Sequence, residues 1–266
     1  MKNHPVPRPG KNPNPFLLIL LSLFAVFRSS QLPAHTIRPS DDFFRTTGSI
    51  VSVSRHEVPY LLAGTGLTLL VFFNDHAIIN KVQEYQSRDT SDFLKYPKYF
   101  GNGLYLAGFG GLNVLSGLVF QSKEWTALGI YLLEGVAVSG IYVSVVKAVF
   151  GRERPYVKHD PYHFRPFSFK ESSFSFYSGH TTEVFTAASV VAHYFRNPYI
   201  SIFVYSLASL TGLERIYNNK HWASDVLVGG ITGVLIGRKI ITLNKDYPQL
   251  RLDKEDLKIS FYIRSF

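Results

Sequence analysis

The sequence predicts an all-α protein, an antiparallel bundle of about six helices that is membrane-associated or membrane-embedded. Apolar segments recur at helical length, and their Leu, Val, Ala and Ile content is typical of helices rather than strands. Short connections between them favour an up-and-down arrangement. The segments span residues 58–73, 103–120, 125–149, 184–195, 199–213 and 226–241.

The composition favours a protein that meets both a membrane and anions. Of 266 residues, 46% are hydrophobic and 15% aromatic, yet the mean hydropathy is only +0.06, between a soluble enzyme and a polytopic membrane protein. The formal charge of +9 favours phosphate esters or acidic lipid headgroups, while the lack of any run of five Lys or Arg argues against nucleic acid. The absence of cysteine excludes disulfides, thiol nucleophiles and Cys-based metal sites. No pattern indicates an oligomeric state.

The N-terminus resembles an export sequence. Lys2, Arg8 and Lys11 precede an apolar run over residues 16–27, too short to cross a bilayer comfortably but suited to the core of a signal peptide. We therefore expect residues 1–34 to be a signal peptide or a retained N-terminal anchor. The expected location is a bacterial-type cell envelope, periplasmic and membrane-associated or integral. A bundle that touches the membrane and a chain that crosses it six times both remain open.

The rest of the chain divides into three parts. Residues 35–102 form an N-terminal helical region, residues 103–243 a catalytic core, and residues 244–266 a tail that alternates like a strand near its end. The longest connection inside the core, residues 150–177, is rich in aromatic residues and proline, and it reads as a loop that either grips a ligand or packs over the open end of the bundle.

Glycines recur every four residues in the last helix, at Gly229, Gly233 and Gly237. Small residues at this spacing allow two helices to approach closely. We expect these glycines to serve helix packing within the chain rather than a dimer interface.

Three motifs follow one another within 80 residues. They are Lys147-x6-Arg154-Pro155, Ser178-Gly179-His180 and Arg215-x5-His221-x3-Asp225. The first ends the third apolar helix, the second opens the fourth, and the last runs from the end of the fifth into the sixth. Because neighbouring helices in an up-and-down bundle are antiparallel, all three motifs are expected at one pole.

The motif residues suit a phosphate group. Lys147, Arg154 and Arg215 supply three cations for its oxygens. Ser178 and Gly179 stand where a loop becomes a helix, and backbone N–H groups at such a point face an anion. Gly179 lets the backbone approach closely, because glycine has no Cβ.

The same motifs supply reactive groups. His221 and Asp225 are four residues apart, so on a helix they would share a face, and a carboxylate on one imidazole nitrogen would leave the other free to attack phosphorus. His180 would protonate the leaving alkoxide and later help to activate water.

Together these motifs resemble the type 2 phosphatidic acid phosphatase (PAP2) superfamily over roughly residues 100–240. The resemblance implies a phosphohistidine on His221, with Asp225 as orienter and His180 as acid and base. It also implies phosphate binding by Lys147, Arg154, Ser178, Gly179 and Arg215. No metal and no other cofactor is implied.

Two positions depart from the family pattern. Tyr177 stands where a proline usually precedes Ser-Gly-His, and Glu214 stands where a serine usually precedes the arginine. An inward carboxylate would repel phosphate, so we expect Glu214 to pair with a cation or to face away.

The expected function is a metal-independent phosphatase that hydrolyses a phosphate monoester or pyrophosphate, with a lipid as the favoured substrate over a small phosphate ester. One alternative is a soluble-type nonspecific acid phosphatase. A vanadium-dependent haloperoxidase shares the phosphate-site pattern but belongs to typically much longer chains. A catalytically weak protein that binds anionic lipids is a further alternative, motivated by Tyr177 and Glu214.

Overall fold

The computed structural model describes residues 58–157 and 160–244, two short strands, and residues 47, 48 and 55. The expected signal peptide or anchor, residues 1–34, lies outside the described residues. The helices are α3 (Val58–Glu84), α4 (Arg88–Leu94), α5 (Gly103–Val119), α6 (Lys123–Phe150), α7 (Gly179–Phe195), α8 (Pro198–Tyr217) and α9 (Ala223–Leu243). Two short 3-10 turns, η1 (Pro97–Tyr99) and η2 (Glu171–Ser173), complete the helical part.

The predicted helical bundle is confirmed, with one small addition. Each predicted apolar segment coincides with one long helix, and only short α4 had no apolar segment of its own. The tail adds an antiparallel pair of strands, β1 (Gln249–Leu252) and β2 (Ile259–Tyr262), in which Gln249 faces Tyr262. The strand-like pattern near the end of the chain therefore corresponds to a strand.

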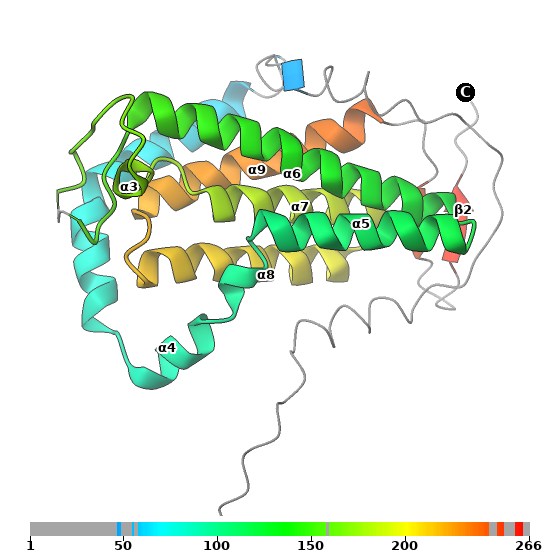
Figure 1. Ribbon diagram of the computed structural model, residues 1–266, viewed down its shortest axis with the longest axis horizontal. Helices are drawn as coiled ribbons and strands as arrows, with labels where there is room; N and C mark the ends of the chain where they lie inside the picture. Colours follow the sequence, from blue (N-terminus) through cyan, green and yellow to red (C-terminus); the bar gives the residue numbers. More distant parts are fainter. Residues whose placement is uncertain are drawn as a thin grey trace, which may run out of the picture.

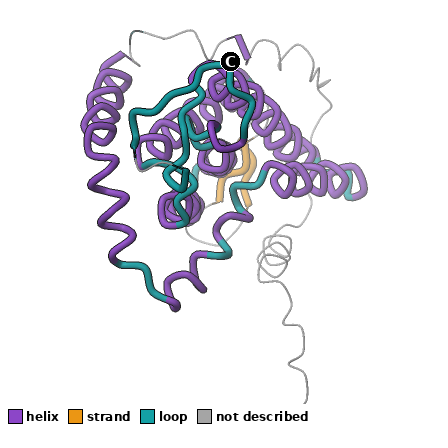
Figure 2. The backbone as a smooth tube through the Cα atoms, turned by 60° about the vertical axis from the view of Figure 1, so that its left-hand side comes forward, coloured by secondary structure: helices purple, strands orange, loops and turns teal. Residues whose placement is uncertain are grey.

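The long helices run back and forth, so that α6 and α8 end where α7 and α9 begin, at the left of Figure 1. The loop that joins α6 to α7 and part of α3 lie at this same end, while β2 lies at the opposite end (Figure 1). Figure 2 shows α3 standing beside this loop. The motif residues are all carried to this end, which we call the motif pole.

A glycine turns the chain out of α6. Gly151 has a φ of +58°, and an added Cβ there would lie 1.8 Å from the carbonyl oxygen of Arg165. Only glycine fits such a left-handed cap with backbone packed against it. The sharp turn directs the next residue, Arg152, back toward the helices, where it is fully buried.

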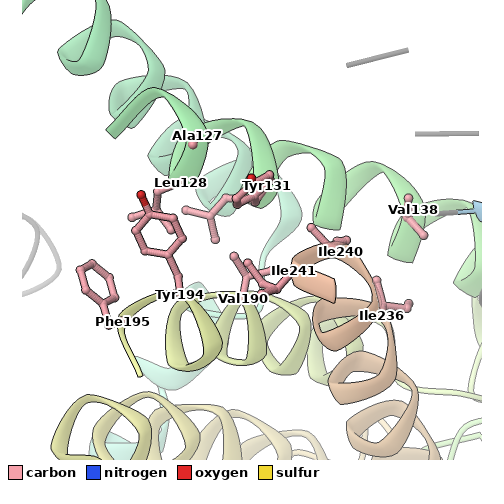
Figure 3. Close-up of a cluster of buried hydrophobic side chains, with 11 residues drawn as sticks. Ala127, Leu128, Tyr131, Val138, Val190, Tyr194, Phe195, Ile236, Ile240 and Ile241 are labelled. Atoms are coloured by element: carbon pink, nitrogen blue, oxygen red, sulfur yellow. The ribbon is translucent and has the colours of Figure 1, made fainter. Parts of the chain in front are cut away.

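The main apolar core lies between α6, α7 and α9 (Figure 3). Tyr131 and Leu132 of α6, Val190 and Tyr194 of α7, and Ile240 of α9 are all 3% exposed or less. Burial of side chains this large stabilises the bundle by about 1.5–3 kcal/mol each. This core fixes the ends of α6, α7 and α9 relative to one another.

Helices α7 and α9 are in backbone contact along the glycine row. A Cβ added at Gly229, Gly233 or Gly237 would lie 2.5–2.7 Å from a carbonyl oxygen of the α7 stretch. The glycines therefore serve packing within the chain, as expected, and they bring the starts of α7 and α9 side by side.

Three of the described helices, α3, α6 and α9, are long and apolar enough to cross a membrane. Helix α3 directs Tyr60, Leu62, Leu67, Leu70 and Phe73 outward, each at least half exposed. A large apolar face of this kind is stable against lipid. The chain is therefore a membrane-associated helical bundle.

Candidate active site

Lys147, in the last turn of α6, is the cation closest to the start of α7. A Cβ added at Gly179 would lie 3.4 Å from the Lys147 Nζ. Among the described residues this ammonium has no hydrogen bond or ion pair, although it lies within electrostatic range of Arg154 and Arg215. The three cations expected from the sequence thus share one neighbourhood, and Lys147 is available to an anion.

The start of α7 keeps its backbone donors open. Ser178 is the N-cap residue, yet its side chain does not cap the helix; its Oγ instead accepts a hydrogen bond from the Thr181 hydroxyl at 2.8 Å. The Ser178 N–H donates to the carbonyl of Asp225 at 3.1 Å, which ties α7 to α9. Uncapped N–H groups beside Lys147 form an anion-binding position.

Arg154 and Arg215 already hold carboxylates. The Arg154 Nη1 lies 2.9 Å from Glu171 Oε1, while its Nε is buried without a hydrogen-bond partner in the described part of the chain. The guanidinium of Arg215 is bound through both Nε and Nη2 by Glu214, with a 2.6 Å bond from Nη2 to Oε1. Glu214 therefore pairs with a cation, as expected, and that cation is Arg215, one of the residues expected to bind phosphate.

His221 is buried and held in one tautomer. It is 2% exposed, and its Nδ1 lies 2.8 Å from the carbonyl oxygen of Ser175. A carbonyl can only accept, so Nδ1 carries the proton and Nε2 keeps its lone pair. Burial lowers the pKa of His221 to about 4, with the Asp225 carboxylate opposing the shift and Lys147 adding to it. At neutral pH the side chain is a neutral base.

Asp225 holds His221 less directly than expected. Its Oδ2 is 3.8 Å from the His221 Nδ1, because His221 lies before the N-cap of α9 and not on a shared helical face. The carboxylate instead accepts from the Ser175 hydroxyl at 2.5 Å and from the Trp222 N–H at 3.0 Å. Ser175 therefore links the two residues, its carbonyl holding His221 and its hydroxyl bound to Asp225.

Sequence reasoning missed the residues beneath this pair. Arg152 is 0% exposed, and its Nη1 lies 2.7 Å from Asp225 Oδ1 while its Nη2 lies 2.8 Å from Asp75 Oδ2. Ser224 joins the same cluster. Two signals were available: an aspartate just after the apolar segment 58–73, and a second arginine two residues before Arg154.

His180, in the first turn of α7, is also neutral in the protein alone. Burial lowers its pKa to about 3, and Arg215, His221, Lys147 and Arg154 add to the effect. A phosphate dianion among these groups would oppose it and raise the pKa. His180 can therefore act as an acid only with the substrate in place.

Glu183, three residues further along α7, is a half-buried acidic side chain near Lys147. Burial raises its pKa to about 7, while the nearby Lys147 ammonium opposes this shift.

Tyr177, the other departure from the family pattern, is 4% exposed, and its hydroxyl forms a hydrogen bond with Thr232 of α9. The phenol thus bonds to α9 at Thr232, nine residues after the start of that helix. Among the described residues, no group of three or more His, Asp or Glu side chains is arranged to hold a metal ion.

Residues 128–247 match the family model described as "PAP2 superfamily". This region belongs to the PAP2 superfamily. The match covers the helices α6 to α9 that carry the motifs, whereas α3 and Asp75 lie outside it.

Among curated PAP2 relatives, the chain is 36% identical over 119 residues to a lipid A 1-phosphatase of Porphyromonas gingivalis, covering 44% of this chain and 24% of that protein. It is 31% identical over 130 residues to phosphatidylglycerophosphatase B of Bacillus subtilis, covering 46% of this chain and 59% of that protein. The chain thus spans a quarter to somewhat over half of these relatives.

The fold has a counterpart among solved structures. A transmembrane PAP2-type phosphatidylglycerolphosphate phosphatase from Bacillus subtilis superposes with a TM-score of 0.54 at 20% identity. The alignment covers 79% of this chain and 97% of that one. The all-helical fold is therefore that of a membrane PAP2 protein.

Proposed function

We propose that this protein is a metal-independent phosphatase that removes a phosphate group from a lipid through a phosphohistidine on His221. The observation that carries the proposal is the state of His221. A neutral imidazole, with its Nδ1 proton fixed on the Ser175 carbonyl, presents its Nε2 lone pair at a pole that also holds a free ammonium and open helix N–H groups.

In the first step, Nε2 of His221 attacks phosphorus and the bond from phosphorus to the ester oxygen breaks. His180, protonated in the complex, gives its proton to the leaving alkoxide. Lys147, the buried Nε of Arg154 and the first N–H groups of α7 stabilise the equatorial oxygens.

In the second step, the now neutral His180 takes a proton from water, which attacks phosphorus. The bond between phosphorus and nitrogen breaks, inorganic phosphate leaves and both histidines are restored. The balance is ester plus water to alcohol plus phosphate, with no oxidant, reductant or metal required.

A lipid substrate is supported by the outward apolar faces of the bundle and by the names of the relatives, a lipid A 1-phosphatase and a phosphatidylglycerophosphatase. The test is phosphate release in detergent micelles with EDTA present. The panel is lipid A, phosphatidic acid, phosphatidylglycerol phosphate, a polyprenyl pyrophosphate and an aryl phosphate.

The matched variant is His221→Ala. We expect EDTA-resistant turnover of at least one lipid and a loss of at least about 10³-fold in the variant. Acid-labile labelling of the wild type from ³²P substrate, absent in the variant, would identify the phosphohistidine. Fast turnover of the aryl phosphate alone would favour a nonspecific phosphatase, and lipid binding without turnover would favour a binding protein.

We also propose that the motif pole faces the extracytoplasmic side, after export directed by residues 1–34. The chain has no cysteine, so single cysteines can report topology. Lys170→Cys, exposed at the motif pole, is expected to react with a membrane-impermeant maleimide in intact spheroplasts. Gln121→Cys, exposed at the other pole, is the comparison. Labelling of Gln121→Cys alone would place the site on the cytoplasmic side.

A further inference from the structure

A buried charged cluster lies directly beneath the candidate nucleophile. Arg152 is its centre, contacting Asp75 at 2.8 Å, Asp225 at 2.7 Å and the Ser224 hydroxyl at 2.8 Å. Its Nε donates to the carbonyl of Pro161 at 2.9 Å. The side chains of Arg152, Asp75 and Asp225 are all 0% exposed.

The guanidinium is enclosed by rings as well as by carboxylates. Its carbon lies 4.8 Å from the ring centre of Phe72, 5.5 Å from that of Trp222 and 5.6 Å from that of Phe164. Aromatic faces add to the hold on a cation. Arg152 therefore has no room to rotate toward a substrate, and its role must be carried through its partners.

The hydrogen bonds fix the charge of Asp75. Its Oδ1 accepts from the Ser224 N–H at 2.9 Å, and its Oδ2 accepts from Arg152 and from the Ser224 hydroxyl. The Ser224 hydroxyl accepts from Arg152 and donates to Asp75. Every contact of Asp75 is with a donor, as a carboxylate requires.

The cluster thus carries two negative charges and one positive. If Asp225 were the only carboxylate of the cluster, the positive charge of Arg152 would cancel its negative charge, and no net charge would remain beside His221. With Asp75 as well, a net negative charge remains in a site shielded from water, where charge interactions are strong. This matters in the reaction, because an imidazole that keeps its Nδ1 proton becomes cationic when Nε2 bonds to phosphorus.

We propose that Asp75 is a positioning residue for the nucleophile: through Arg152 and Ser224 it holds Asp225 in place and keeps the cluster negative, so that the ring of His221 can take up positive charge on attack. This inference rests on the proposed phosphatase activity. It assigns a role to a residue of α3, outside the region that matches the family model.

The test is the kinetics of Asp75→Asn and Asp75→Glu, purified as full chains in detergent. The substrate is whichever of lipid A, phosphatidic acid and phosphatidylglycerol phosphate the wild type hydrolyses. Phosphate binding by Lys147 and α7 is untouched, so KM should stay within about twofold while kcat of the Asn variant falls about 10- to 100-fold, the usual range for residues behind a reactive group. The Glu variant, which keeps the charge, should recover a large part of kcat.

Glu124→Gln is the matched control. Glu124 is also a buried carboxylate, 3% exposed, but it lies 23 residues before Lys147 on α6, about 35 Å away at 1.5 Å per residue. It should lose stability without losing kcat. Equal kcat values for the wild type and Asp75→Asn would overturn the inference, and so would an Asp75→Glu variant as slow as Asp75→Asn.

Asn places an N–H donor against the donors around Asp75, so that variant can fail to fold. Ser224→Ala then decides, because it removes the hydroxyl that accepts from Arg152 and donates to Asp75 beside their direct contact, and it adds no clash. A severalfold fall in kcat at constant KM supports the inference, and an unchanged kcat refutes it. If the wild type itself releases no phosphate from any lipid, the proposed function fails first, which is a distinguishable result.

Discussion

The two ends of helix α6 differ in what surrounds them. Toward Glu124 the helix packs in the apolar core with Tyr131, Tyr194 and Phe195. Two tyrosine hydroxyls donate to backbone carbonyls there, Tyr194 to Glu124 at 2.8 Å and Tyr131 to Asn244 at 3.5 Å. Near Lys147 the neighbours are histidines, arginines and carboxylates, most of them buried or half-buried. Buried charges are weak evidence for stability, since desolvation opposes their attraction. The apolar end therefore holds the bundle together, and the polar end carries the residues of the proposed chemistry.

The largest effect should separate the two ends of this one helix. Lys147→Gln removes the free ammonium at the start of α7, and we expect phosphate release to fall about 100-fold, as for the loss of one donor to a developing charge. Lys123→Gln, at the other end of α6, should leave the rate unchanged. Steady-state phosphate release from the same lipid measures both. Equal losses would mean that the difference between the ends is not functional.

Glycine substitutions should show that the two ends are coupled through α7 and α9. An added Cβ at Gly233 would lie 2.5 Å from the carbonyl oxygen of Thr182, so Gly233→Ala should cost about 1–3 kcal/mol in stability and also lower kcat, because the starts of both helices move. Gly111→Ala on α5 has open space and should gain about 0.4–1 kcal/mol. Thermal unfolding in detergent compares them. An unchanged kcat in Gly233→Ala would show that this packing does not affect the site.

The pH dependence of stability should come from the motif pole. The pKa of His221 is lowered to about 4 and that of His180 to about 3, so the folded state favours their neutral forms. Their contribution is complete above the unfolded pKa of about 6.5 and is lost as the pH falls toward 4. We expect the melting temperature to fall across that window. His180→Asn should flatten the curve, and inorganic phosphate, which raises the pKa of His180, should do so in the wild type.

The smallest expected effect concerns Glu214. Glu214→Ser frees the Nε and Nη2 of Arg215 for phosphate, so inhibition by inorganic phosphate should strengthen about three- to tenfold, the effect of one or two charge-assisted hydrogen bonds. Without phosphate the melting temperature should fall, because Arg215 loses its buried partner. Glu214→Gln keeps the shape and serves as the comparison. Unchanged inhibition would show that Glu214 leaves Arg215 free to bind.

The sequence predicted the bundle and the gathering of its motifs well, for a physical reason. Long apolar segments make the helices easy to recognise in the sequence. The antiparallel order of these helices then places Lys147, His180 and His221 at one end. The prediction was weaker for the extended segments between helices, where the sequence does not indicate which side chains point inward. Arg152 and Arg154 are two residues apart, and spacing alone does not say which is inside. The path of the 151–178 loop, which brings Ser175 between His221 and Asp225, has no local signal either.

The sequence did not reveal the role of Asp75, because its partners Arg152 and Ser224 are 77 and 149 residues away. A pattern read along the chain detects neighbours, whereas a buried ion pair is a property of the finished fold. Its local sign was an acidic residue two positions after the apolar segment 58–73, and a buried charge is tolerated only when it is paired.

The Arg152 cluster also sets an order of events during synthesis. A chain made from its N-terminus contains Asp75 and Arg152 well before Ser224 and Asp225 have left the ribosome. Until α9 joins, one carboxylate and one guanidinium face each other without their remaining partners, and neither His221 nor its support exists. On the proposed function, a chain that still lacks α9 cannot act, and activity begins only when this helix is in place.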